Sequence, residues 1–120
     1  MRLVQVINAD RGVELGRRIA LADHWLSRLR GLLGRPEPQP GEGLLLVPCR
    51  SVHMMGMRYP IDVAFLDSDR RVLSIHCGLR PGPRTAGIRG ARYALELPSG
   101  TLDATGTVPG NRLNWQESTL

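Results

Sequence analysis

Short apolar stretches with the β-rich composition of strands recur along most of this chain, and turn residues separate them. The first runs from Leu3 to Ile7 and is followed by Asp10-Arg11-Gly12, which has the composition of a tight turn. Val13 to Leu21 can then return as a second strand. The opening of the chain therefore predicts a β-hairpin.

The spacing of the apolar residues changes after Asp23, which is a candidate helix N-cap. From there the apolar residues fall at helical spacing and arginines take the outer face. Gly34 and Pro36 are typical of a helix end. The segment RPEPQPGEG at 35–43 has a proline at every second position from 36 to 40, which predicts an extended linker too short to divide domains. The apolar residues of the predicted helix are Trp25, Leu26, Leu29, Leu32 and Leu33.

The rest of the chain has the composition of strands and turns. Asp67-Ser68-Asp69-Arg70 predicts a tight turn that joins an antiparallel pair. The segment 78–90, rich in Gly, Pro and Arg, is interpreted as a long loop of the kind that often carries function. Ser99 is expected to cap one short helical turn. The further predicted strands are 43–47, 50–54, 61–66, 72–77, 93–97 and a last one near Leu113 and Trp115.

One helix among seven or eight short strands indicates a mainly β protein. We expect a mainly antiparallel sheet folded over on itself, as a β-sandwich or a partly open, jelly-roll-like barrel, with one N-terminal helix and a short helical turn. A length of 120 residues suits one domain over residues 1–120.

The net charge is +5, and all sixteen basic residues are arginines. The arginines are scattered from Arg2 to Arg112 without a long run, and only five aromatic residues of the Phe, Trp and Tyr types are available to stack on bases, which argues against nucleic-acid binding. Gln5 and Asn8 interrupt the first apolar run, so the chain predicts neither an export signal nor a membrane span. We expect a cytoplasmic protein with reduced cysteines.

Four segments together resemble the DUF192 family (uncharacterised ACR, COG1430). They are RGLLGRPEP, GEGLLLVPCRSVHMMGMRYPIDVAFLD, RVLSI and ARYALELPSGTLDATGTVPGNRL, and the likeness covers roughly residues 20 to 114. The resemblance implies a compact β-rich fold of the jelly-roll or barrel type. It implies no activity, because the family has none securely assigned.

Residues 49 to 67 bring together side chains that could take part in binding or catalysis, on a stretch that otherwise has the pattern of buried sheet. Gly56 predicts a shaped bend, because glycine reaches conformations closed to other residues. We expect a small, non-enzymatic ligand-binding or accessory module without a cofactor, whose pocket is formed by segments 49–60 and 78–90. Its partner would be a small molecule or a protein, and the sequence leaves the oligomeric state open. The candidate ligand-binding residues are His53, Met55, Met57, Arg58, Tyr59, Asp62, Arg84 and Glu96.

Roles within this pocket follow from residue type. Arg58 and Arg84, with Arg80 and Arg89, would give an anion-accepting rim. Met55, Met57 and Tyr59 would form an apolar floor, while His53 and Asp62 would orient polar groups of the ligand.

A first alternative is an enzyme that uses His53 with Asp62 or Glu96 as acid and base. Each carboxylate lies within an apolar strand and must be paired, reach solvent or have a raised pKa. We expect Asp62 to be at least partly buried and hydrogen-bonded to the bend at 55–60.

A second alternative is a metal or redox protein that uses Cys49, His53 and Cys77, with His76 as a further ligand. It requires Cys49 and Cys77 to lie close together. His76 and Cys77 are adjacent in a predicted strand and would point to opposite faces, which weakens the metal hypothesis.

Overall fold

The computed structural model describes residues 2–23, 34–83 and 85–118. These residues form nine strands and one short helix, so the chain is mainly β, as predicted. The helix predicted over 25–33 lies outside the described residues. The elements are β1 (Leu3–Asn8), β2 (Val13–Ala22), β3 (Glu42–Leu46), β4 (Ser51–His53), β5 (Ile61–Leu66), β6 (Val72–Leu79), β7 (Thr85–Gly87), β8 (Tyr93–Pro98), α2 (Thr101–Thr105) and β9 (Leu113–Glu117).

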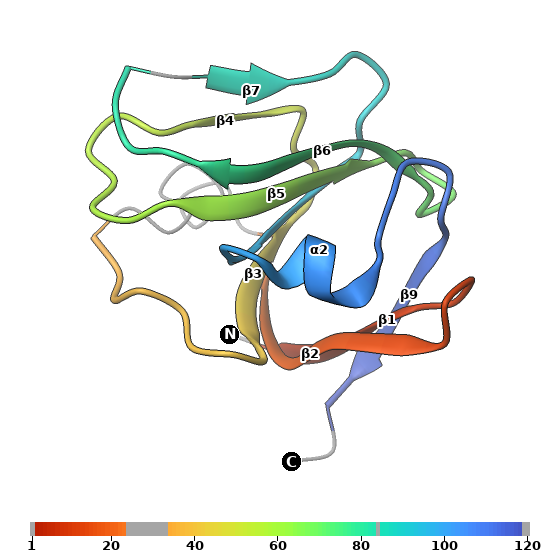
Figure 1. Cartoon of the computed structure of the whole chain (residues 1–120). Coiled ribbons are helices and arrows are strands. Elements are labelled where there is room, and N and C mark those ends of the chain that lie inside the picture. Colours follow the sequence, from red (N-terminus) through yellow and green to blue (C-terminus); the bar gives the residue numbers. More distant parts are fainter. Residues whose placement is uncertain (1, 24–33, 84, 119–120) are drawn as a thin grey trace.

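Seven of these strands form one sheet in the order β6-β5-β8-β3-β2-β1-β9, which curls into a half-barrel (Figure 1). Neighbouring strands are antiparallel except β2 and β3, which run parallel with Ile19 opposite Gly43. A parallel pair needs a long crossover connection, which the chain between Ala22 and Glu42 supplies. The predicted sheet was mainly antiparallel, and the parallel pair is the exception.

The edge strands β6 and β9 meet at one end of the half-barrel, and we call this junction the seam. Arg71 and Arg112 form an antiparallel bridge there, and the Val72 amide donates to the Asn111 carbonyl at 2.8 Å. The turn at 67–70 leads into the seam, and it joins β5 and β6 as an antiparallel pair, as predicted.

A second layer consists of β4 and β7, which Figure 1 shows above β5 and β6. Val52 lies opposite Ala86, and both side chains are buried. The prediction of a plain loop over 78–90 was therefore wrong in its middle, where three residues pair with β4. Gly87 permits this approach, because a Cβ there would lie 2.6 Å from the carbonyl oxygen of Arg50.

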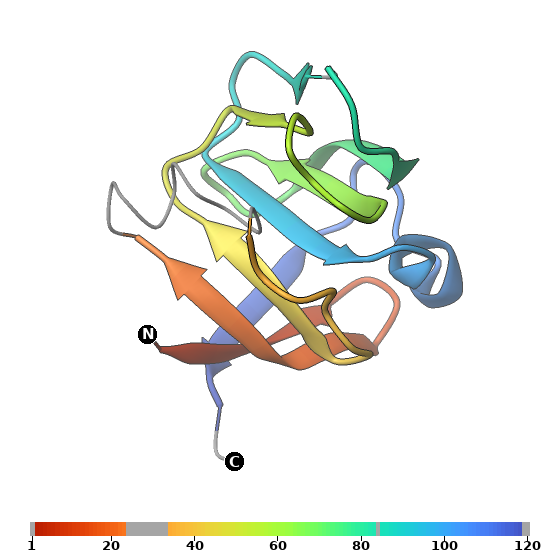
Figure 2. The ribbon, with the colours of Figure 1, turned by 90° about the vertical axis from the view of Figure 1, so that its left-hand side faces the viewer.

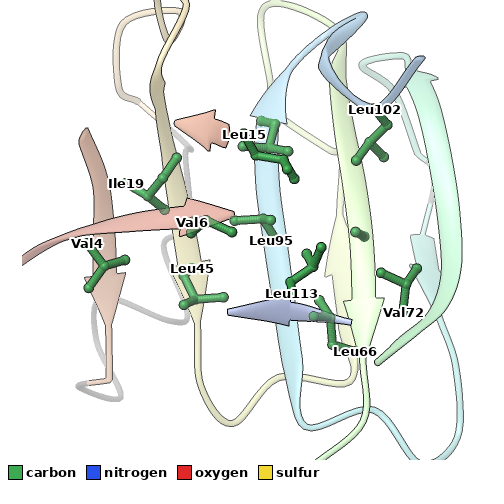
Figure 3. Close-up of a cluster of buried hydrophobic side chains, with 12 residues drawn as sticks. Val4, Val6, Leu15, Ile19, Leu45, Leu66, Val72, Leu95, Leu102 and Leu113 are labelled. Atoms are coloured by element: carbon green, nitrogen blue, oxygen red, sulfur yellow. The ribbon is translucent and has the colours of Figure 1, made fainter. Parts of the chain in front are cut away.

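The core occupies both faces of the curled sheet. All six residues of β5 are buried, because β5 lies between two strands and has packed side chains on each face. One face holds the cluster drawn in Figure 3, in which Leu66 and Leu95 pack with Leu102 of α2. The other face packs against Val52 and Ala86 of the second layer. Each such aliphatic side chain contributes about 1.5–3 kcal/mol when fully buried.

The short helix α2 covers one end of the first cluster. Its N-cap is Gly100, in the left-handed region with φ 96°, and not Ser99 as the sequence predicted. Among the described residues, the structure contains no helix that is both long enough and apolar enough to cross a membrane.

Candidate functional site

The bend at residues 54–59 follows β4 and turns at Gly56, whose φ of 86° lies in the left-handed region. The Met57 amide donates to the Met54 carbonyl at 3.2 Å and closes the turn. Met54 is buried, whereas the Met55 side chain is 69% exposed. The bend predicted from Gly56 is therefore present, but Met55 points to solvent and does not form a pocket floor.

A depression of about 360 Å³ lies beside this bend. Its walls come from two segments, 57–59 and the proline-rich segment 34–37. In Figure 2 the chain around 34–41 runs in front of β3. A second depression of about 430 Å³ lies against β2 and β3 and shares Arg35, Pro36 and Glu37 with the first. Both volumes are in the range of small-molecule sites.

The predicted pocket thus has one of its two walls. Segments 49–60 and 78–90 do lie side by side, since β4 pairs with β7 and the Gly82 amide donates to the Met54 carbonyl at 3.3 Å. The depression at Arg58, however, has segment 34–37 as its other wall. Arg84 lies outside the described residues, and Arg80 and Arg89 are exposed and do not line the depression.

Arg35 is the half-buried cation of the depression, and it is not among the site residues predicted from the sequence. Its side chain makes no hydrogen bond or ion pair with any described residue, and its Nε atom is buried without an acceptor. Buried donors are normally satisfied, so this one is an exception that needs a reason. The segment GLLGR, which carries the family resemblance, contains Arg35 and was the signal that could have identified it.

Tyr59 connects the two walls. Its hydroxyl lies 3.2 Å from the Arg35 carbonyl oxygen and 3.3 Å from that of Pro36, so its proton is shared between the two. Burial raises the pKa of Tyr59, the negative charges of Glu96 and Glu37 raise it further, and the Arg35 guanidinium opposes them. The depression therefore contains a neutral phenol together with the Glu37 carboxylate and the Arg35 guanidinium, while the charge of Glu96 acts on the phenol from outside the lining.

Asp62 is a structural anchor. Its carboxylate is fully buried and accepts hydrogen bonds from the amides of Gly78 at 2.8 Å, Gly100 at 3.1 Å and Leu102 at 2.9 Å. The predicted burial is confirmed. The predicted partner was wrong, because these three amides belong to β6 and to the start of α2 and not to the bend at 55–60.

Glu96 is also buried, but on the other face of the sheet. Leu97 lies opposite Asp62, and Val63 lies opposite Glu96. Because successive side chains of a strand alternate between faces, the two carboxylates point in opposite directions. Glu96 is the one whose charge acts on Tyr59.

His53 is exposed at the end of β4, where its Nδ1 lies 3.0 Å from the Thr85 hydroxyl. Val52, the preceding residue, points into the core, so His53 points away from it. Asp62 is enclosed by backbone amides, and Glu96 faces the core side of the second layer. The structure therefore does not bring His53 together with either carboxylate as an acid and base pair.

Neither Cys49 nor Cys77 forms a disulfide bond, and the two lie toward opposite ends of β5. Cys49 is tied through Arg92 to the Leu66 end, because the Cys49 amide donates to the Arg92 carbonyl and the Arg92 amide to the Leu66 carbonyl. Cys77 lies near Asp62, whose charge acts on its thiol. The span from Asp62 to Leu66 is about 13 Å at roughly 3.3 Å per residue. The proximity that the redox alternative required is absent.

No group of three His, Cys, Asp or Glu side chains in the described part of the chain is arranged to hold a metal ion. Desolvation raises the pKa of the exposed Cys77 thiol, and the charges of Asp62 and Asp103 add to the effect. A raised pKa lowers the thiolate fraction, so this cysteine is a weak nucleophile and a weak metal ligand at neutral pH. His76 instead packs edge-on against Phe65, with ring centroids 5.6 Å apart.

Comparison with known proteins gives one consistent result. Residues 6–115 match the model of the DUF192 family, described as Uncharacterized ACR, COG1430. A UPF0127 protein of Pyrococcus furiosus is 32% identical over 113 residues, covering 92% of this chain and 97% of that protein. A UPF0127 protein of Thermococcus sibiricus is 32% identical over 118 residues, covering 92% of this chain and 74% of the other.

Two solved structures are also similar. A protein of unknown function from Novosphingobium aromaticivorans has a TM-score of 0.77 and 26% identity, covering 94% of this chain and 84% of the other. A putative transcription regulator from Sinorhizobium meliloti has a TM-score of 0.81 and 28% identity, covering 95% of this chain and 92% of that one.

Proposed function

We propose that this protein, which belongs to the DUF192 family, is a non-enzymatic module that binds a small organic anion in the depression between segments 34–37 and 57–59. The observation that carries the proposal is the Arg35 guanidinium, which lines the depression and has no acceptor among the described residues. A buried donor without a partner costs about 1–3 kcal/mol. An anionic ligand would supply the missing acceptor and recover part of this cost.

The composition of the walls supports an organic anion of low charge. Arg58 is exposed on the rim and adds a second cation, while Met57 and Pro36 give apolar contact area. Glu37 lies on the same rim and would repel a ligand with several negative charges. A molecule with one carboxylate or one phosphate ester and a short apolar body fits this balance.

Ligand binding can be tested without knowing the natural ligand, because anything that prefers the native form raises the melting temperature. The probes are sodium salts of small mono- and dicarboxylates, sugar phosphates and, as neutral controls, the free sugars. We expect stabilisation by monoanions and none by the neutral compounds. Isothermal titration of the best probe then gives its dissociation constant.

Two variants locate the site. Arg35→Gln keeps most of the side-chain volume and removes the charge, and it should weaken binding of the best monoanion at least tenfold. Arg80→Gln removes the same charge from an exposed position that does not line the depression, and it should leave binding unchanged. Equal losses in both variants, or stabilisation by the neutral sugars alone, would overturn the proposal.

A further inference from the structure

The fold gathers arginines that are far apart in the sequence. The Arg71 backbone bridges to Arg112 across the seam. The Arg92 carbonyl accepts from the Cys49 amide, and the Arg50 carbonyl accepts from the Ile88 amide at 3.1 Å. In Figure 1 the turn that joins β5 to β6 and the start of β9 lie on the right-hand side, and the chain that leads into β4 lies nearer the middle. We call this region the arginine end; its members are Arg11, Arg50, Arg70, Arg71, Arg89, Arg92 and Arg112.

The arginine end holds an excess of positive charge. Seven of the thirteen described arginines belong to it, against three of the eleven acidic residues, which are Asp10, Asp67 and Asp69. The local excess is therefore four positive charges. The other described residues include six arginines and eight acidic residues, an excess of two negative charges. The charge asymmetry lies in the folded structure and not in any run of sequence.

The positive charges at this end lack ionic partners within the described residues. The two ion pairs among the described residues join Arg2 with Asp23 and Arg17 with Glu14, and both lie outside the arginine end. The nearby carboxylates serve the backbone instead. Oδ1 of Asp67 accepts from the Asp69 amide at 2.9 Å and the Arg71 amide at 3.0 Å, and Asp10 accepts from the Arg112 amide at 2.8 Å.

The bridge between Arg71 and Arg112 is unfavourable by itself. Both residues are exposed, and residues directly opposite on antiparallel strands have Cβ atoms about 4.5–5.5 Å apart, at which like charges repel. Arg71 turns one nitrogen to the Gly110 carbonyl at 3.0 Å, which satisfies a donor without neutralising the charge. A bound anion between the two guanidinium groups would remove this repulsion.

The scatter of the arginines along the sequence argued against nucleic-acid binding, but the fold brings seven of them to one end. We propose that the arginine end binds the phosphate backbone of nucleic acid without reading its sequence. The row from Arg112 through Arg71, Arg92 and Arg50 crosses four strand spacings of about 4.8 Å and spans roughly 19 Å, over which a nucleic-acid strand presents several phosphates. Guanidinium groups bind phosphate through paired hydrogen bonds. The inference uses no residue of the depression and stands independently of the proposed function.

The side chains around this row of arginines favour contact with the phosphate backbone of a nucleic acid. They do not favour recognition of its bases or binding of an acidic protein. One face of Trp115 is covered by Arg70, 3.9 Å from the ring centroid, and its edge meets Tyr93, so it is not free to stack on a base. Protein interfaces need buried apolar anchors. The exposed large hydrophobic residues near this end in the described structure are Val13 and Val108, and they are only 38% and 41% exposed.

The test is fluorescence anisotropy with a 5′-labelled 20-nucleotide single-stranded DNA of mixed sequence, titrated between 50 and 200 mM NaCl. Four phosphate contacts predict a slope of about −2.8 for log K against log salt, which is about a fifty-fold loss of affinity over this range. Arg50→Ala with Arg92→Ala removes two contacts but keeps the backbone hydrogen bonds. Its slope should fall to about −1.4, or about a sevenfold loss.

The control variant combines Arg2→Ala with Arg80→Ala, which removes the same charge from exposed positions outside the arginine end. It should keep the slope of the unmodified protein. An equal fall in both double variants would mean diffuse charge and would overturn a localised site. Labelled poly-L-glutamate bound as tightly as the DNA would point to an acidic protein partner and overturn the nucleic-acid assignment. No binding at 50 mM NaCl would overturn the proposal outright.

Discussion

Replacing Asp62 should destabilise the protein strongly, because one carboxylate holds three backbone amides from two elements. In Asp62→Asn the amide oxygen can replace Oδ2 and still accept from Gly100 and Leu102. The amide nitrogen then faces the Gly78 N–H, donor against donor. Losing a hydrogen bond to a charged group costs about 1.5–3 kcal/mol, so we expect a loss of about 2–3 kcal/mol. Asp62→Ala loses all three bonds, and since water can reach the exposed Gly100 we expect about 3–4 kcal/mol.

The measurement is urea unfolding followed by far-UV circular dichroism. With a slope near ~1.5 kcal/mol per molar urea, the Asn variant should unfold about 1.3–2 M earlier than the unmodified protein. Asp103→Asn makes the same chemical change at an exposed position of α2 and should stay within about 0.5 kcal/mol. If Asp62→Asn is as stable as this control, the carboxylate does not anchor β6 and α2, and our interpretation of Asp62 as structural is wrong.

Two further predictions concern packing and pH. Gly43→Ala would place a Cβ 2.5 Å from the Glu96 carbonyl oxygen, so the β3–β8 contact must shift; we expect a loss of about 1–3 kcal/mol, and an unchanged urea midpoint would contradict this. The folded-state pKa of Tyr59 is raised, so its stabilising contribution is complete below the unfolded pKa and is lost as pH rises through the folded one. The stability advantage over Tyr59→Phe should therefore be constant at pH 7–9 and shrink above about pH 10; an advantage that persists at pH 11 would refute the linkage.

Local pattern was enough to predict most of the strands. The apolar run 61–66 specifies β5, and the turn at 67–70 reverses the chain so that β6 pairs with β5 antiparallel. All of this information lies within one short stretch of chain. The parallel pairing of β2 with β3 was not predictable, because the pairing depends on where the crossover returns and the strand pattern does not encode this. The three residues of β7 are too few to show a period, and only their partner β4 makes them a strand.

The candidate site was half predictable for a similar reason. Gly56 marked the bend, and residue type drew attention to Arg58 and Tyr59, which do line the depression. Arg35 was not predicted, because it is one of sixteen arginines and because the proline-rich segment was interpreted as a linker. The arginine end was invisible for a physical reason: its members are spread over a hundred positions, and only the strand order brings them together.

The position of β9 has a consequence for how the protein is made. This strand is the last of the described strands, yet it pairs with β1, the first of them, with Val4 opposite Glu117. A ribosome synthesises roughly 5–20 residues per second, so the outer edge of β1 waits seconds for its neighbour. During that time its amide and carbonyl groups could pair with another nascent copy. The molecule therefore completes its sheet only once synthesis has passed residue 117, and crowded polysomes are where misassembly would begin.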